Sequence, residues 1–370
     1  MALQFRTSAE KLAVTVSDDV VFDDPTAKRV YSAVVGDDTF DFKIENTTNW
    51  GVNKDAYIKV DDNLDHTVTV SDFVYANLDY TTANSADITL ENAKRADIKT
   101  GAGDDKITVN VVNSLNAGFA GWDSPTLVKD STFNIDSGAG NDTIIFRTGT
   151  SDPGLNLAIS KYTLTNIHAG EGNDTIDMGS GSLAETRDTI YGEGGNDIIH
   201  AAGGDDFVDG GDGDDFIFGE SGNDVLHGGK GKDYIEGGTG NDTIYGGDDA
   251  DFIRGGAGTD TIHGGAGNDK ISGGTGSDFL FGDDGADTFV IGHGDLIMED
   301  VNGQPKLPAV DTIMDFDGSA GDRIDVEKPG NWQIVDAGAD THLINSEAPE
   351  GSMVVLKGVH AADFHSDWLI

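Results

Sequence analysis

Apolar residues in the middle of the chain recur every nine positions. The recurring residues are Ile199, Val208, Ile217, Leu226, Ile235, Ile244, Ile253, Ile262, Ile271, Leu280 and Phe289. Each lies in a triplet such as Tyr234-Ile235-Glu236, whose alternation of polar, apolar and polar residues predicts a short strand with one inward side chain. The residues before each triplet are rich in glycine and polar, which favours a tight loop because glycine tolerates positive φ.

An aspartate precedes each of these apolar residues by two positions and keeps the same period. The aspartates are Asp188, Asp197, Asp206, Asp215, Asp224, Asp233, Asp242, Asp251, Asp260, Asp269, Asp278 and Asp287. From residue 192 onward, the residue two positions before the aspartate is glycine in every repeat but one. In the repeat of Asp251 this residue is Asp249. A flexible glycine-rich linker would not keep this register, so the pattern indicates an ordered repeat.

The period predicts an all-β fold. One strand and one loop make half a coil, and two nonapeptides make a full turn. Stacked turns give a parallel β-roll, a β-solenoid whose rungs lie about 4.8 Å apart. Only one side chain in nine points inward, so apolar burial is a weak source of stability for such glycine-rich loops.

Stacking places a column of aspartates on each edge of the roll, and these columns repel unless a cation neutralises them. Carboxylates and loop carbonyls are hard oxygen ligands that suit Ca²⁺ better than Mg²⁺, which demands stricter geometry. One ion between each repeat and the repeat two further along gives roughly nine Ca²⁺ ions in the regular roll.

The composition agrees with a cation-binding protein. The chain has 370 residues, a formal net charge of −44, 52 glycines and no cysteine. Such a charge disfavours nucleic acid and anionic membrane surfaces as partners. No apolar run is long enough for a membrane-spanning helix, so we expect no membrane insertion, and no N-terminal secretory signal is recognisable.

The repeats resemble the glycine–aspartate nonapeptide of RTX proteins, G-G-x-G-x-D-x-(apolar)-x. The resemblance covers residues 188–290 and implies calcium bound in the glycine-rich loops. It also implies secretion through a type I apparatus to the extracellular space or cell surface of a Gram-negative bacterium.

The motif also occurs upstream without strict spacing. "GAGDDKI", "GAGNDTI" and "GEGNDTI" contain Asp105, Asp142 and Asp174, which we predict as further metal ligands. We interpret residues 86–187 as irregular solenoid rungs with inserted loops, for example around 113–130 and 147–160; separate hairpins are the alternative. Residues 1–85 are rich in strand formers and predict either a small β domain or a capping, assembling end.

Residues 291–370 are expected to cap the roll and to carry the secretion signal. The segment "DTIMDFDGSAGDRIDV" (311–326) resembles the closing segment of RTX β-rolls in serralysin-type proteases, and Asp311, Asp315, Asp322 and Asp325 are candidate ligands for a further ion. The final residues "DWLI" resemble uncleaved type I secretion signals.

The sequence favours a non-enzymatic function. No histidine begins an H-E-x-x-H motif and no serine lies in G-x-S-x-G, so zinc-protease and serine-hydrolase chemistry lack their motifs. His200, His227 and His263 occupy the last position of their repeats and are expected to point outward. We predict a structural surface protein (an S-layer, filament or matrix component) that self-associates or binds cell-surface polysaccharide; an adhesin and an RTX hydrolase are the alternatives.

Overall fold

The computed structural model describes residues 29–36, 39–46, 55–59, 65–71, 75–81, 85–91, 95–112, 131–149, 163–179, 187–291, 310–326, 332–345 and 353–370. These residues form strands joined by short loops, with a single 3₁₀ turn at Ser366–Trp368 in the described part. The predicted all-β parallel solenoid is confirmed. The chain divides into two compact units, Met1–Gly203 and Gly204–Ile370.

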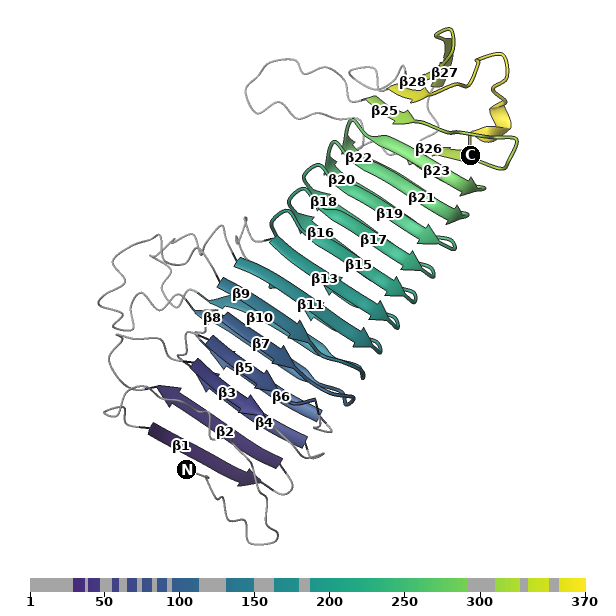
Figure 1. Ribbon diagram of the computed structural model, residues 1–370. Helices are drawn as coiled ribbons and strands as arrows, with labels where there is room; N and C mark the ends of the chain where they lie inside the picture. The colour runs from purple at the N-terminus through teal and green to yellow at the C-terminus, as the bar shows by residue number, and fades with distance from the viewer. Residues whose placement is uncertain are drawn as a thin grey trace, which may run out of the picture. The chain divides into compact units, whose positions relative to one another are not determined.

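In the first unit, odd and even strands pair in two separate sheets (Figure 1). One sheet contains, in order, β1 (Arg29–Gly36), β2 (Thr39–Asn46), β4 (Asp65–Ser71), β6 (Ser85–Glu91), β8 (Lys106–Val112), β10 (Thr143–Gly149), β12 (Thr175–Asp177) and β14 (Ile198–His200). The other contains β3 (Asp55–Lys59), β5 (Tyr75–Asp79), β7 (Arg95–Lys99), β9 (Ser131–Asp136), β11 (Thr163–Glu171) and β13 (Arg187–Gly194). Pairing is parallel from β2 and β3 onward, while β1 and β2 are antiparallel.

The second unit has the same two-sheet arrangement. One sheet contains β16 (Phe216–Ser221), β18 (Tyr234–Thr239), β20 (Phe252–Gly258), β22 (Lys270–Gly276), β24 (Thr288–Ile291) and β26 (Arg323–Val326). The other contains β15 (Phe207–Asp212), β17 (Val225–Lys230), β19 (Thr243–Asp248), β21 (Thr261–Gly267), β23 (Phe279–Gly285), β25 (Val310–Ile313), β29 (Met353–Leu356), β28 (Thr341–Asn345) and β27 (Trp332–Asp336). The last three strands of this sheet pair antiparallel with one another.

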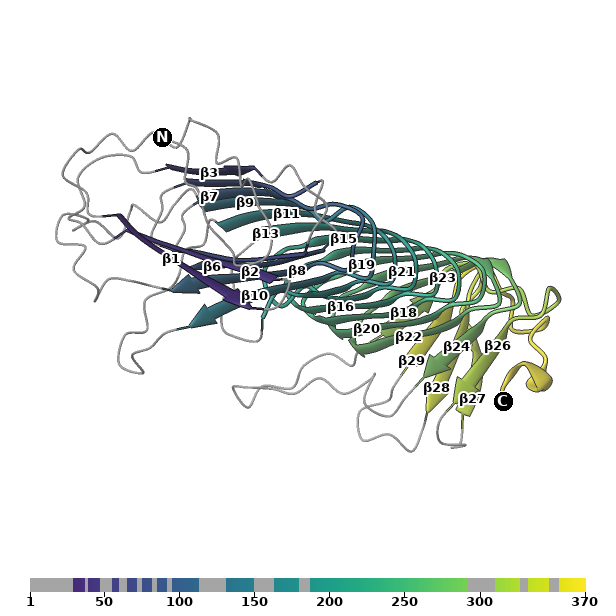
Figure 2. The same cartoon turned by 90° about the horizontal axis from the view of Figure 1, so that it is seen from below.

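The core is a ladder of single apolar side chains. In the second unit, Ile217 lies beside Ile235, and Ile235 beside Ile253, with each repeat stacked on the repeat 18 residues away. All the apolar residues predicted to point inward from the regular repeats are buried. Figure 2 shows the two layers of strands from below.

The C-terminal residues lie against the last strand of a sheet. The Ile370 N–H donates to the Ile324 carbonyl at 2.9 Å, and the Val326 N–H donates to the Ile370 carbonyl at 3.2 Å. Trp368 packs near Phe316, with ring centroids 5.5 Å apart, and also covers Gly318. A side chain at Gly318 would collide with the indole ring.

Candidate metal centre

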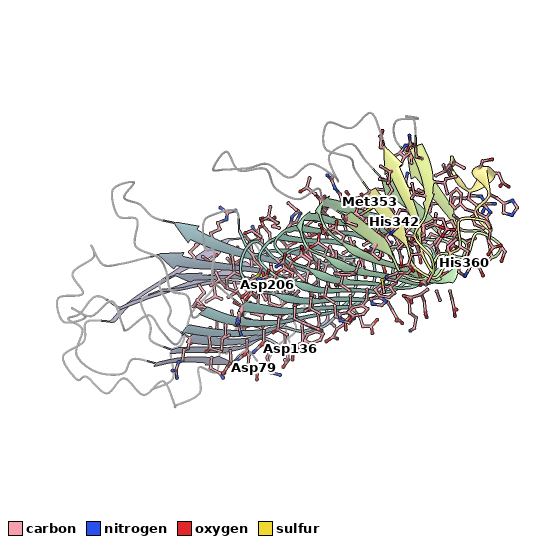
Figure 3. The ribbon with its side chains drawn as sticks, turned by 90° about the horizontal axis from the view of Figure 1, so that it is seen from above. Asp79, Asp136, Asp206, His342, Met353 and His360 are labelled. Carbon is pink, nitrogen blue, oxygen red and sulfur yellow. The ribbon has the colours of Figure 1, made fainter. Side chains whose placement is uncertain are left out.

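The predicted aspartates form continuous hydrogen-bonded columns, because the backbone N–H of each donates to the carboxylate of the aspartate on the next rung. In the second unit one column contains Asp206, Asp224, Asp242, Asp260, Asp278 and Asp311, and the other contains Asp215, Asp233, Asp251, Asp269, Asp287 and Asp322. The side chains lie in the loops at the starts of the strands, where Figure 3 marks Asp206. The predicted spacing of two repeats between neighbours in a column therefore holds from Asp206 to Asp287.

The motif aspartates upstream belong to one such column despite their irregular spacing. The Asp105 N–H donates to Asp142 Oδ1 at 2.8 Å, the Asp142 N–H to Asp174 Oδ1 at 2.6 Å, and the Asp174 N–H to Asp197 Oδ1 at 2.8 Å. Asp188, the next motif aspartate in the sequence after Asp174, lies instead on the other sheet, in β13.

Each column leaves the second carboxylate oxygen facing inward. The Oδ2 atoms are buried and accept no hydrogen bond in Asp105, Asp142, Asp174, Asp224, Asp233, Asp242, Asp251, Asp260, Asp269 and Asp287. An unsatisfied buried carboxylate oxygen costs free energy unless a cation or a proton reaches it. This row of oxygens is the strongest indication of a ligand in the fold.

The first glycine of each repeat packs directly against this oxygen, and we call this close contact the glycine cradle. A Cβ atom built on Gly219 would lie 2.6 Å from Asp224 Oδ2 and 2.6 Å from the carbonyl oxygen of Gly237, the first glycine of the next rung. The same pair of oxygens surrounds Gly210, Gly219, Gly228, Gly237, Gly246, Gly255 and Gly264. A carboxylate oxygen and a carbonyl oxygen thus lie against each of these glycines, so a side chain at this position would collide with both.

Burial dominates the electrostatics of the columns. It raises the pKa of Asp224 and Asp251 to about 8 and that of Asp233 to about 7, and the hydrogen bond from the preceding aspartate's N–H opposes the rise only in part. Without a cation, therefore, these carboxyl groups take up protons near neutral pH.

The donor set fits a hard oxygen-seeking ion. Among the described residues, no group of three or more His, Cys, Asp or Glu side chains could hold a metal. Backbone carbonyls must therefore supply many of the ligands, which suits Ca²⁺ with its six to eight oxygens and flexible geometry. The ion would supply the positive charge that the buried Oδ2 atoms lack.

The C-terminal candidate ligands have different surroundings. Asp311 and Asp322 end the two columns, but Asp322 Oδ2 accepts the Asp317 N–H at 2.7 Å. Asp315 accepts the N–H groups of Gly282 and Asp283, both at 2.9 Å. Asp325 lies within β26 beside Val290, outside the columns. Asp311 and Asp322 therefore continue the columns of the repeat aspartates, whereas Asp315 and Asp325 do not.

A second ladder runs one position before the aspartates. Asn173 accepts the Asn196 N–H at 2.7 Å, and Asn223 accepts the Asn241 N–H at 2.8 Å. The frequent Asn-Asp pair in the sequence is the signal that could have revealed this ladder, which the sequence analysis missed.

Two of the outward histidines are part of a stack of rings. On one sheet of the second unit, His227 stacks on Tyr245 (ring centroids 4.7 Å apart), Tyr245 on His263 (5.2 Å) and His263 on Phe281 (4.2 Å). The rings stack face to face, so these contacts stabilise the pairing of neighbouring rungs in the same way as other cross-strand side-chain pairs.

Two comparisons with known proteins found similarity to this chain. The model of the RTX calcium-binding nonapeptide repeat (four copies) matches residues 166–182, 185–208, 200–235, 209–244, 227–262 and 254–289. The solution structure of the AlgE6R3 subunit from the Azotobacter vinelandii mannuronan C5-epimerase is 32% identical to this chain, covering 38% of this chain and 80% of that chain, with a TM-score of 0.29. No curated protein matches.

The repeats and the fold define an RTX β-roll, and residues 166–289 are RTX calcium-binding nonapeptide repeats. Calcium is the ion that repeats of this kind bind, and they indicate a secreted, extracellular protein. In the part of the chain that the structure describes, no helix is long and apolar enough to cross a membrane.

Proposed function

We propose that this chain is a secreted structural protein of a Gram-negative cell surface, exported by a type I apparatus, whose roll folds on extracellular calcium. The observation that supports the proposal is the row of buried Oδ2 atoms, each facing a carbonyl oxygen across a glycine cradle. The repeat aspartates and the loop carbonyls would hold the ions, one between successive rungs of each column. Because the cradles form only when rungs stack, metal binding and folding are coupled.

A calcium titration of the metal-free chain tests this proposal. Far-UV circular dichroism should show strand structure rising cooperatively as Ca²⁺ is added, in the range of roughly 10⁻⁴–10⁻³ M that is typical of extracellular modules. Mg²⁺ at the same concentrations serves as the control and should be much less effective. A repeat array that is fully folded in chelator and insensitive to Ca²⁺ would refute the proposal.

Assembly is supported by the edge strand β27. It pairs only with β28 among the described strands, and its Ile334 and Val335 are 43% and 37% exposed. An apolar edge strand is a ready template for pairing with another copy of the chain. Electron microscopy with and without Ca²⁺ should show lattices or filaments in wild type and their loss in Ile334→Lys.

A monodisperse monomer under all calcium conditions would favour the adhesin alternative. Direct binding to purified cell-surface polysaccharide, measured with the same calcium-loaded chain, would then distinguish a glycan-binding module from an inert one. Hydrolysis of that polysaccharide would indicate the enzyme alternative.

A further inference from the structure

One outward face of the second unit carries a row of aromatic side chains. The residue before the buried apolar position is Phe216 in β16, Tyr234 in β18, Phe252 in β20 and Lys270 in β22, and strand pairing sets these four side by side. Phe216 and Phe252 are 49% and 39% exposed. Large apolar side chains that are exposed in a continuous row, rather than singly, indicate an interaction surface.

The rings of this row stack on one another. The ring centroids of Phe216 and Tyr234 lie 5.9 Å apart, and those of Tyr234 and Phe252 lie 5.2 Å apart with planes 3° from parallel. Beyond Phe252, the Lys270 Nζ atom lies 5.8 Å from its ring centroid. A flat ligand that must stack on a ring therefore finds the faces of Tyr234 and Phe252 covered, and the row offers its outer edge to a partner.

A second row on the same strands contains one acid and one base. The residue after the buried apolar position is Phe218 in β16, Glu236 in β18, Arg254 in β20 and Ser272 in β22. Glu236 and Arg254 are therefore neighbours in the middle of the row, with an uncharged residue on each side. We call the surface formed by the two rows the aromatic–basic face.

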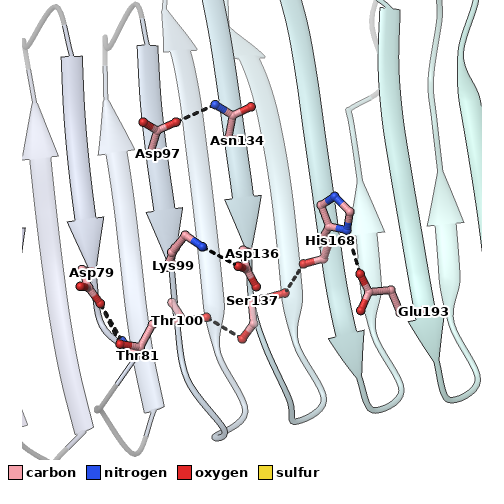
Figure 4. A network of polar contacts seen from close by, with 10 residues as sticks. All are labelled: Asp79, Thr81, Asp97, Lys99, Thr100, Asn134, Asp136, Ser137, His168 and Glu193. Atoms are coloured by element: carbon pink, nitrogen blue, oxygen red, sulfur yellow. Dashed lines mark hydrogen bonds and ion pairs between the residues drawn. The ribbon is translucent and has the colours of Figure 1, made fainter.

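The bases of the aromatic–basic face have no acid partner of their own. Arg254 and Lys270 are exposed, and neither forms an ion pair with another described residue. In the first unit, by contrast, Lys99 Nζ lies 2.9 Å from Asp136 Oδ2 (Figure 4). The corresponding outward positions of β15, β17, β19, β21 and β23, on the other sheet of the second unit, contain no lysine or arginine. In a chain with a formal net charge of −44, this face is suited to an acidic partner.

We propose that the aromatic–basic face binds the same face of a second copy of the chain about a two-fold axis. An axis that runs along the strands, between β18 and β20, keeps the strand direction and reverses the strand order. Glu236 then faces the partner's Arg254, Tyr234 faces the partner's Phe252, and Lys270 faces the partner's Phe216.

Each of these pairs is favourable. The first is an ion pair formed twice by symmetry, the second joins two aromatic rings, and the third places an ammonium group near a ring. A contact between identical faces requires a self-complementary pattern of this kind. Two sheets that pack face to face lie about 10 Å apart, which leaves room for these side chains to meet.

The inference rests on the proposed function, because the two rows line up only when the calcium-loaded rungs stack. It adds a self-contact that is distinct from the edge strand β27. Two different self-contacts on one chain are sufficient for an extended assembly, whereas a single two-fold contact stops at a dimer.

Sedimentation velocity of the calcium-loaded full chain tests the inference, with Ile334→Lys as the background that removes the β27 contact. This chain should still dimerise. Arg254→Glu should raise the dimer Kd at least about tenfold, because carboxylates then face each other at both symmetry-related positions. Glu236→Arg should weaken the dimer similarly, and Glu236→Arg/Arg254→Glu should restore it. Lys232→Glu changes the net charge as Arg254→Glu does but lies in an exposed loop outside the face, so it should leave the dimer unchanged.

Cross-linking tests the register of the two copies, since the chain contains no cysteine. A mixture of Phe216→Cys and Lys270→Cys chains should react with a bifunctional thiol reagent that spans about 10 Å. Phe216→Cys alone should react far less, because its two thiols are offset by three rungs, about 14 Å along the stack. Equal reaction of the mixture and of Phe216→Cys alone would overturn the two-fold arrangement.

A calcium-loaded monomer at all concentrations, a dimer that Arg254→Glu leaves unchanged, or a double variant no tighter than the single variants would also overturn the inference. A monomer that binds polysaccharide and loses it in Arg254→Glu would overturn it too, because the occupant of the face is then a glycan. Failure of the chain to fold when calcium is added would instead refute the proposed function. Circular dichroism at saturating calcium distinguishes these two failures.

Discussion

The rungs between residues 95 and 149 and the regular repeats between residues 206 and 291 build the same kind of β-solenoid by different means. In the first region, strands bury two apolar side chains each: Ile107 and Val109 in β8, and Ile144 and Phe146 in β10. In the repeats, the strands from β15 to β23 bury one large apolar side chain each, such as Ile235 in β18. Each fully buried side chain of this kind contributes about 1.5–3 kcal/mol.

The two regions also differ in how their edges are closed. Asp188 on β13 lies opposite Thr165, and the residues that continue this line are Phe133 and Ala96, so the first unit has no second aspartate column at these rungs. The repeats have aspartate columns on both edges and glycine in every cradle from Gly210 onward. The comparison teaches that the first region relies on a larger apolar core, whereas the repeats place more buried carboxylates at their edges.

Calcium removal should produce the largest difference between the two regions. In chelator we expect residues 206–291 to lose hydrogen-exchange protection throughout, because their thin core cannot offset the entropy of ordering glycine-rich loops. Residues 95–112 and 131–149 should retain measurable protection. Mass spectrometry of peptides from each region measures this exchange. Equal loss of protection in both regions would show that the difference in core and cradle has no energetic consequence.

Filling one cradle in the repeats should have the next largest effect. In Gly237→Ser the new side chain would lie 2.6 Å or less from the Gly255 carbonyl and Asp242 Oδ2, so we expect loss of calcium at that site and a severalfold higher calcium midpoint for folding. The matched control is Ser137→Ala, which removes a natural hydroxyl and should leave the midpoint unchanged. A calcium titration followed by circular dichroism measures both.

The pH of the medium should change the stability of the metal-free repeats. Burial raises the folded-state pKa of Asp224 and Asp251 to about 8, above the unfolded value of 3.8. The stabilising contribution of their protonation is complete below the unfolded pKa and is lost as pH rises through the folded pKa. Metal-free protein should therefore show more strand structure at pH 5 than at pH 8.5.

Calcium must displace these protons, so its apparent affinity should be lower at pH 6 than at pH 8. Asp224→Asn/Asp251→Asn serves as the control, since removing two titrating groups should reduce the pH dependence. A chain whose metal-free strand content rises with pH would contradict the burial of these carboxyl groups.

Backbone strain at one irregular repeat should produce the smallest effect. Asp249 replaces a repeat glycine and has a φ of 75°, so Asp249→Gly should stabilise the calcium-loaded roll by about 1 kcal/mol. Gly240→Ala, at the same position of the preceding repeat, should destabilise it, because Gly240 has a φ of 136° and its Cβ would overlap the Gly222 carbonyl. Thermal unfolding at saturating calcium compares the two; destabilisation by Asp249→Gly would indicate that this carboxylate binds calcium.

The sequence alone determined the parts of the fold that depend on a short period. The nine-residue repeat places Ile235 inward and Asp233 at a loop, since both positions follow from the alternation of side chains along a strand and from glycine-permitted turns. The stacking of repeats two apart follows from the same period. The β-roll and its calcium chemistry could therefore be predicted before any coordinates, and the class of protein followed from the resemblance of the repeats to RTX nonapeptides.

Tertiary structure decided which residues share a rung where the period breaks. Asp174 joins Asp197 in a column although Asp188 is nearer in sequence, and Asp325 lies outside the columns although its surroundings in sequence are equally acidic. Loop length costs little free energy, so spacing along the chain does not specify the partner. The hydrogen-bond partner of Thr100 was likewise decided by stacking, because the carbonyl that it meets belongs to Ser137, on the next rung of the solenoid.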